Sequence, residues 1–233
     1  MTNKAPTIVL FDMDGTTVRH INPQLLNLLE GLDDFAHKAG KFFSKLFKRK
    51  ISSPTLVEFH DGKRKKLLVH RAIHKIRRKE IDQIVEPCPG IFSLLDYLRS
   101  NNIRMGIISN GLGKGYGHDI LETFALEDYY EVKLFREDIQ RAKPNPDPII
   151  KATERLDPKL TENDVIWYIG DRSKDIEAAQ ASKNHLECPI IPFAYNMHAA
   201  LAVLRYNYGP SNIIMSWAEF ETKIRESLKE TKV

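Results

Sequence analysis

Short runs of apolar residues alternate along most of the chain with stretches whose apolar positions follow a helical period. The first run, Thr7–Phe11, reads TIVLF and ends directly before Asp12. Unbroken apolar runs of this kind, with β-branched residues, are typical of strands buried on both faces of a parallel sheet. We expect further strands at Arg104–Ser109, Val165–Ile169, Pro189–Phe193 and Asn212–Met215, and a weaker one at Glu131–Phe135.

Helical patterns lie between these runs, with apolar residues three or four positions apart. They predict helices at Ile91–Ser100, His118–Leu126, Pro146–Leu156, Lys174–Lys183 and Trp217–Lys229. Ser216 is the expected N-cap of the last helix. Strands that alternate with helices indicate βαβ units, so the predicted fold class is α/β, a three-layer Rossmann-like fold with a parallel sheet.

The segment 19–87 breaks this alternation. Leucine and phenylalanine recur there at helical spacing, and the proline and glycine residues at 87–90 mark the return to the sheet. We therefore predict two domains. Residues 1–18 and 88–233 form the α/β core domain, and residues 19–87 form an inserted, mostly α-helical cap.

Charge separates the same two parts of the chain. Between Lys38 and Lys79 there are 15 Lys and Arg residues and two acids, a net charge of +13, whereas the rest has 20 basic and 29 acidic residues, a net of −9. The cap is therefore basic and should attract anions. Alternatively, these charges form a solvated face, or Phe42 and Phe47 lie among the lysines on an amphipathic helix that binds an anionic membrane.

Composition excludes several classes of protein. Hydrophobic residues make up 42% and charged residues 28%, as in globular proteins. Two cysteines, Cys88 and Cys188, are too few for a disulfide-rich secreted scaffold. No apolar run approaches the roughly 18 residues that cross a bilayer, and the N-terminus lacks a signal-peptide pattern. We expect a cytoplasmic protein without a transmembrane segment, of unknown oligomeric state.

Two carboxylates follow the first predicted strand, in DMDGT at positions 12–16. Residues two apart on a strand point to the same side, so Asp12 and Asp14 face one space beyond the carboxyl end of the strand, where open parallel sheets bind ligands. A bound Mg²⁺ would offset their mutual repulsion with oxygen ligands. An ordinary acidic turn is the alternative; a calcium loop fits poorly, because Gly15 is in the wrong place for it.

Polar residues also follow later strands. Ser109 and Asn110 end one strand, and their hydroxyl and amide suit phosphate oxygens. Lys143 precedes a helix, where it would offset the charge of the aspartates and of a phosphate. Asp171 lies at the tip of the VIWYI strand, and Asp175 falls in the first helical turn after it, where helix capping is the simpler interpretation.

The loop Gly111–Gly117 has glycine at every second position. Its spacing matches neither the dinucleotide-binding fingerprint nor the P-loop. We interpret it as a mobile loop beside the site.

The chain resembles the haloacid dehalogenase-like (HAD) phosphohydrolase superfamily over about residues 7–230. DMDGT, Ser109, Lys143 followed by proline, and GDRSKD at 170–175 occur in the order of that family's four motifs. KPNPDPI and the GDxxxDIxxA pattern are most similar to the phosphoglycolate phosphatase and β-phosphoglucomutase branch, and segment 19–87 is placed like the family's first-position cap. Thr17 stands where a leucine is usual, a departure that we expect to lie outside the chemistry.

This resemblance implies an Mg²⁺-dependent phosphoric monoester hydrolase that works through an aspartyl-phosphate. The first aspartate of DMDGT would attack phosphorus, and the second would act as general acid and base. The implied catalytic residues are Asp12, Asp14 and Lys143. The implied phosphate ligands are Ser109, Asn110 and Lys143. The implied metal ligands are Asp12, Asp14 through its backbone carbonyl, Asp171 and Asp175, the last directly or from the outer shell.

Several functions remain open. The basic cap indicates a small phosphorylated substrate with further negative charge, such as phosphoglycolate, a sugar phosphate or a nucleotide. A nucleic-acid-end phosphatase, or a protein whose cap binds nucleic acid or a membrane, is the alternative, and nucleic acid is the less favoured partner. A phosphomutase or a phosphonatase is a further alternative within the superfamily. Asp14 favours phosphate esters over haloacids, because a displaced halide needs no proton donor.

Overall fold

The strand Ile8–Asp12 (β1) lies at the centre of the sheet, and all its residues are buried. The computed structural model describes residues 4–21, 81–157 and 159–230. Within them, β1 pairs in parallel with Arg104–Ile108 (β4) on one side and with Ile166–Gly170 (β6) on the other. The sheet continues with Val132–Leu134 (β5), Ile190–Tyr195 (β7) and Ile213–Ile214 (β8), in the order β5-β4-β1-β6-β7-β8.

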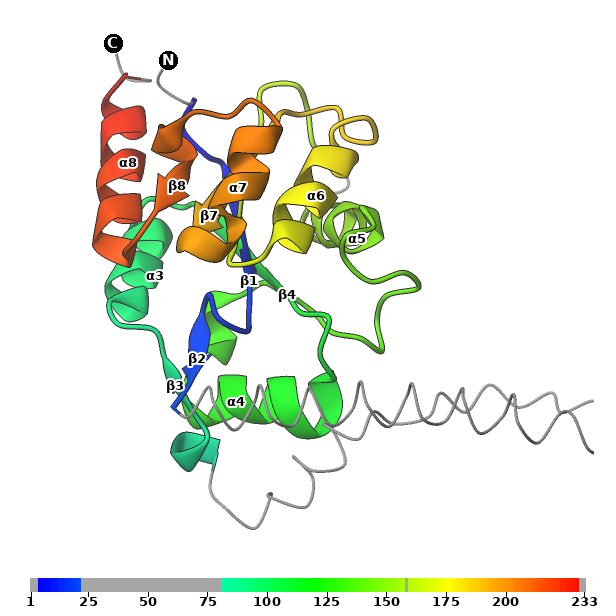
Figure 1. The fold of residues 1–233 in the computed structure, drawn as a ribbon, viewed down its shortest axis with the longest axis vertical. Helices are drawn as coiled ribbons and strands as arrows, with labels where there is room; N and C mark the ends of the chain where they lie inside the picture. The colour runs from blue at the N-terminus through cyan, green and yellow to red at the C-terminus, as the bar shows by residue number, and fades with distance from the viewer. Residues whose placement is uncertain (1–3, 22–80, 158, 231–233) are drawn as a thin grey trace, which may run out of the picture. The chain divides into compact units, whose positions relative to one another are not determined.

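Helices cover both faces of this sheet, which gives three layers (Figure 1). One face packs against Asp147–Leu156 (α5), Ser173–Ser182 (α6) and Met197–Arg205 (α7). The other packs against Ile91–Ser100 (α3) and Trp217–Glu230 (α8). A short helix, His118–Thr123 (α4), follows β4. The predicted α/β Rossmann-like fold class is therefore confirmed.

Successive residues of β1 point to opposite helical layers, which explains why the strand is apolar throughout. Ile8 and Leu10 belong to the core cluster that includes Ile149 of α5 and Ala178 of α6. Phe11 faces the other layer, where its ring centroid lies 5.8 Å from that of Trp217 in α8. Because both faces of the strand are covered, its positions are apolar until the strand ends at Asp12.

The predicted strands and helices agree with the structure to within a few residues. Ser216 is the N-cap of α8, because the backbone N–H of Glu219 donates to its hydroxyl at 3.2 Å. Helix α7 was missed. Its sequence, MHAALAVLR, exposes the apolar Met197, Leu201 and Leu204 while alanine and valine side chains are buried, so most of its exposed face is apolar and the helical period is hard to recognise.

Two short strands, Val18–His20 (β2) and Val85–Pro87 (β3), form a separate two-stranded sheet. By its internal contacts the chain divides into two units, Met1–Arg19 with Val85–Val233, and His20–Ile84. Most of the second unit lies outside the described residues, so the basic helical cap and the exact domain boundaries remain predictions. None of the helices in the described part of the chain is long and apolar enough to cross a membrane.

Candidate active site

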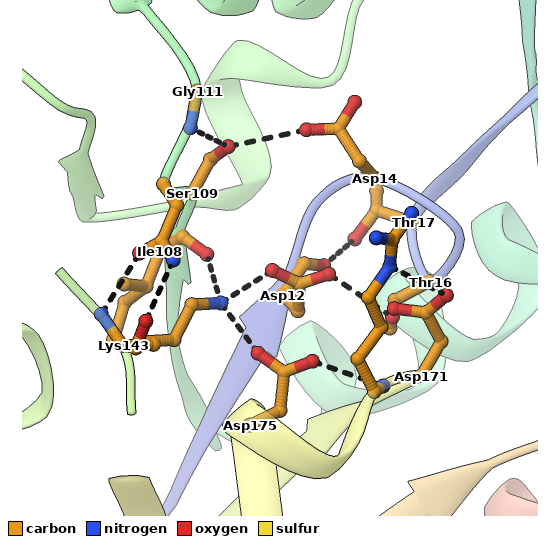
Figure 2. A network of polar contacts seen from close by, with 12 residues as sticks. Asp12, Asp14, Thr16, Thr17, Ile108, Ser109, Gly111, Lys143, Asp171 and Asp175 are labelled. Carbon is orange, nitrogen blue, oxygen red and sulfur yellow. Dashed lines mark hydrogen bonds and ion pairs between the residues drawn. The ribbon is translucent and has the colours of Figure 1, made fainter. Parts of the chain in front are cut away.

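The carboxyl ends of β1, β4 and β6 bring most of the sequence-predicted site residues together (Figure 2). Asp12 is the last residue of β1, Ser109 follows β4, and Asp171 follows β6. Lys143 reaches them from the loop before α5, and Asp175 from the first turn of α6. The grouping follows from topology, because neighbouring parallel strands end at the same edge of the sheet.

Lys143 is the buried cation of this group. Its ammonium contacts the Asp12 carboxylate directly, lies 2.7 Å from Asp175 Oδ1, and donates to the Ile108 carbonyl at 3.1 Å and the Tyr168 hydroxyl at 3.0 Å. Burial disfavours its charged form, but the two carboxylates outweigh burial and hold the pKa of Lys143 well above its usual value. The lysine therefore stays charged inside the core.

Asn110 fixes the backbone of Lys143. The Lys143 N–H donates to Asn110 Oδ1 and Asn110 Nδ2 donates to the Lys143 carbonyl, both at 3.0 Å. The amide thereby ties the loop before α5 to the end of β4 and aims the lysine at Asp12. The phosphate contact expected of Asn110 remains a prediction; the observed interaction is with Lys143.

Asp175 is the buried carboxylate that pairs with Lys143. The side chain is completely buried, Oδ1 accepts from the Tyr168 hydroxyl at 3.3 Å as well as pairing with Lys143, and Oδ2 accepts from the Arg172 N–H at 3.1 Å. The last contact is the helix-capping role that the sequence left open for Asp175. Both oxygens are engaged, so its evident effect is on Lys143 and the start of α6.

Burial and neighbouring carboxylates raise the pKa of two of these aspartates, Asp12 and Asp171. Burial, followed by the charge of Asp175, raises the pKa of Asp12 to about 8, although Lys143 opposes the shift. Burial and Asp175 also raise the pKa of Asp171 to about 6. Both groups would ionise more readily next to a cation.

The residues present fit a divalent metal. Asp12, Asp171 and Asp175 each offer a carboxylate oxygen, and these oxygens lie within 4.8 Å of one another. Asp171 Oδ1 is buried and accepts no hydrogen bond from the described residues, which is an expensive state unless a cation meets it. Oxygen-only ligands suit a hard ion such as Mg²⁺.

Gly15 is required by the approach of Asp171. It has φ of +86°, and a Cβ atom there would lie 2.2 Å from Asp171 Oδ2. The glycine that allows the turn after Asp14 thus also allows two strand ends to meet at the site.

Asp14 points away from Lys143 and toward the end of β4 (Figure 2). The Ser109 hydroxyl donates to its Oδ2 at 3.2 Å, and the Tyr116 hydroxyl donates to its Oδ1 at 2.7 Å. Burial and the adjacent Asp14 raise the pKa of Tyr116 well above its usual value, so this hydroxyl stays protonated and donates.

Sequence reasoning missed several residues that contact the site. Thr17 is fully buried, and its hydroxyl donates to the Asp12 carbonyl at 2.8 Å. The expectation that Thr17 lies outside the chemistry stays a prediction. The Thr16 hydroxyl donates to Asp12 Oδ2 at 3.4 Å. Tyr116 and Tyr168 were not singled out either, since a tyrosine in a loop or an apolar strand carries no local signal of a distant carboxylate partner.

Comparison with known proteins shows the family to which the chain is similar. Residues 9–186 match the family model described as haloacid dehalogenase-like hydrolase. A phosphoglycolate phosphatase from Nitrosospira multiformis is 26% identical over 201 residues, covering 81% of this chain and 84% of the relative. The pyrophosphatase PpaX of Halalkalibacterium halodurans is 29% identical over 171 residues, covering 72% and 76%.

Solved structures show the same fold. A HAD-superfamily hydrolase from Ehrlichia chaffeensis superposes with a TM-score of 0.60 at 17% identity, covering 97% of this chain and all of the other. A HAD phosphatase from Thermococcus onnurineus gives a TM-score of 0.51 at 22% identity, covering 81% and 86%. The resemblance drawn from the motifs is confirmed, and the chain belongs to the haloacid dehalogenase-like hydrolase family.

Proposed function

We propose that this chain hydrolyses phosphate monoesters through a covalent phosphate on Asp12. One observation carries the proposal: the buried Asp12 carboxylate touches a buried ammonium, that of Lys143, beside an Asp171 oxygen that lacks a partner in the described structure. A carboxylate with a fixed cation on one side and a cation-binding position on the other is suited to attack an anionic phosphorus centre.

In the first step, a carboxylate oxygen of Asp12 forms a bond to phosphorus as the bond from phosphorus to the ester oxygen breaks. Asp14 gives its proton to the departing oxygen, which leaves as an alcohol. Lys143 offsets negative charge on the transferring group, and Ser109, at the neighbouring strand end, donates a hydrogen bond to one of its oxygens.

In the second step, Asp14 accepts a proton from a water molecule as that water attacks phosphorus. The bond between phosphorus and Asp12 breaks, inorganic phosphate leaves, and the Asp12 carboxylate is restored. Asp14 ends protonated, ready for the next ester, so one residue serves as acid and then as base.

The metal in this proposal is Mg²⁺, held by Asp12, Asp171 and the backbone carbonyl of Asp14, with Asp175 behind them. When bound, it supplies charge neutralisation and Lewis acidity to phosphate oxygens. The donor set supports this assignment, because all the side chains that it brings together are carboxylates.

The proposed substrate is a small anionic phosphate ester, and the proposed location is the cytoplasm. Relatives named phosphoglycolate phosphatase and pyrophosphatase support a small phosphorylated molecule. The alternative of nucleic-acid or membrane binding depends on cap residues such as Lys45, Lys48, Arg49 and Lys50, which lie outside the described residues. It therefore stays a hypothesis, open to test by salt-sensitive retention on DNA, RNA or anionic vesicles.

The test is phosphate release by the purified full-length chain with Mg²⁺ and with EDTA. The first substrate is p-nitrophenyl phosphate, followed by a panel of phosphoglycolate, sugar phosphates, pyrophosphate, mononucleotides and polynucleotides. We expect Mg²⁺-dependent release, abolished in Asp12→Asn, and preference for a small anionic ester.

The matched control is Asp128→Asn, which changes an exposed aspartate of the core away from the site. It should keep full activity. Turnover that persists in EDTA or in Asp12→Asn contradicts the proposed mechanism, and release only from polynucleotides contradicts the substrate class.

A further inference from the structure

Both oxygens of the Asp14 carboxylate accept a hydroxyl, and one of those hydroxyls belongs to a residue outside the family's motifs. Ser109 donates to Oδ2 at 3.2 Å, whereas Tyr116 donates to Oδ1 at the shorter distance of 2.7 Å. Tyr116 comes from the glycine-rich loop between β4 and α4, 102 positions from Asp14 in sequence. The shorter and therefore stronger of the two hydrogen bonds to Asp14 thus comes from Tyr116, which lies outside those motifs.

The loop that carries Tyr116 is attached to the segment after β5. The Gly111 carbonyl accepts from the Arg136 N–H at 2.8 Å. The N–H groups of Gly113 and Lys114 donate to the Glu137 carboxylate at 2.8 and 3.2 Å. The glycine pattern predicted a mobile loop, but these hydrogen bonds attach its backbone to the segment after β5.

Close packing explains the glycines at two of these positions. A Cβ atom at Gly113 would lie 2.7 Å from the Phe135 ring, and one at Gly117 would lie 2.1 Å from it. The loop backbone therefore rests on this ring on both sides of Tyr116, which fixes the direction of the tyrosine.

Substrate binding would affect the two hydroxyls that donate to Asp14, those of Ser109 and Tyr116, in different ways. The Ser109 hydroxyl is the proposed donor to a phosphate oxygen, and it has one proton to give, so a bound phosphate competes with Asp14 for it. Tyr116 holds the other oxygen of Asp14 and its bond does not depend on Ser109. After phosphate binds, Tyr116 can keep Asp14 in place while Ser109 turns to the substrate.

We infer that Tyr116 is a positioning residue for the acid–base chemistry of Asp14, an inference that rests on the proposed function. Because the tyrosine donates to Oδ1, that oxygen is the acceptor of the carboxyl group and the transferable proton is carried by Oδ2, which faces Ser109 and the phosphate position. The proton passes from Oδ2 to the ester oxygen as its bond to phosphorus breaks. Tyr116 keeps its own proton throughout.

Leaving-group dependence tests this role. An alkyl phosphate such as glycerol 1-phosphate needs a proton on its departing oxygen, whereas p-nitrophenolate leaves without one. In Tyr116→Phe we expect kcat/KM to fall about 10- to 100-fold for the alkyl ester, the range for losing a hydrogen bond to an ionisable group, and by less than about threefold for the aryl ester. Using kcat/KM restricts the comparison to steps up to departure of the alcohol.

Two further variants separate positioning from a general structural defect. Tyr129→Phe is the matched control, because it removes another tyrosine–aspartate hydrogen bond of 2.7 Å, to Asp96 on the surface, and should change neither ester. Glu137→Gln weakens the anchoring of the loop. It should therefore lower kcat/KM selectively for the alkyl ester, by a smaller factor than Tyr116→Phe does. In an Asp14→Asn background, Tyr116→Phe should not change the ratio of the two esters further.

The inference is overturned if a folded Tyr116→Phe variant loses kcat/KM equally for both esters, or for neither. Either result leaves the proposed function intact. If Tyr116→Phe does not fold, the same comparison is made with Glu137→Gln, and an unchanged ratio there overturns the inference. A wild-type chain that releases phosphate neither from these two esters nor from any other substrate of the panel overturns the proposed function, and the inference falls with it.

Discussion

The Lys143 ammonium lies 2.7 Å from the Asp175 carboxylate, and neither side chain is exposed to solvent. Asp12 contacts the same ammonium from the other side. The lysine is thus held between the carboxylate proposed to attack and a second carboxylate that is completely buried. The pair lies at the junction of β1, the loop before α5 and the start of α6, so it links stability to the site.

Asp175→Asn should be costly for both folding and activity. It leaves a buried ammonium with only Asp12 as a charged partner, and breaking a buried ion pair costs about 3 to 5 kcal/mol. We expect urea unfolding to show a loss of this order together with weakened phosphate release. Glu86→Gln, which removes an exposed pair with Arg19, should cost less than about 1 kcal/mol. Similar losses in the two variants would contradict a special role for the buried pair.

The convergence of Asp12, Ser109 and Asp171 could be predicted because it depends on strand ends. Each residue follows an apolar run long enough to identify a buried strand, and parallel neighbours end at one edge. The same reasoning identifies the fold class without any knowledge of side-chain contacts.

The contacts of Tyr116 and Asn110 could not be predicted, because they join positions distant in sequence. Tyr116 meets Asp14 across 102 positions, and Asn110 meets Lys143 across 33. Neither partner carries a local pattern that points to the other. The contact of Thr17 was not predicted for a related reason: its departure from the usual leucine was visible, but its hydrogen bond to the Asp12 carbonyl depends on a turn geometry that the sequence does not display.

Mg²⁺ should stabilise the folded chain through Asp171. Burial and Asp175 raise the pKa of this carboxyl to about 6, so its ionised form is disfavoured until a cation meets it. At a free concentration a hundred times the dissociation constant, binding contributes about 2.7 kcal/mol and should raise Tm by about 5 to 10 °C. Thermal unfolding in Mg²⁺ and in EDTA measures this shift without any substrate.

The shift should disappear in Asp171→Asn and persist in Asp128→Asn, whose exposed side chain lies away from the site. A full shift in Asp171→Asn would place the bound cation elsewhere.

Thr17→Val should destabilise the folded chain by removing a hydrogen bond to the backbone of Asp12. Valine has nearly the same shape but leaves the buried Asp12 carbonyl without its 2.8 Å hydrogen bond, a loss of about 1 to 3 kcal/mol. Thr17→Ser keeps the hydroxyl and should retain more stability than Thr17→Val. Urea unfolding of the two variants, with kcat for p-nitrophenyl phosphate, makes the comparison. Equal stability of the two would mean that the hydroxyl is dispensable.

Gly15→Ala should remove activity through geometry alone. The new methyl would meet Asp171 Oδ2 at 2.2 Å, and φ of +86° strains any residue with a Cβ, so Asp171 or the turn after Asp14 must move. A displacement of about 1 Å in such a site can cost about 100-fold in rate. Gly209→Ala is the matched control, since its nearest neighbour would lie 3.4 Å away and its φ of −74° suits alanine. We expect phosphate release to fall at least 100-fold in the first variant and to be unchanged in the second. Wild-type activity in Gly15→Ala would show that the close approach of Asp171 to this turn is not needed for catalysis.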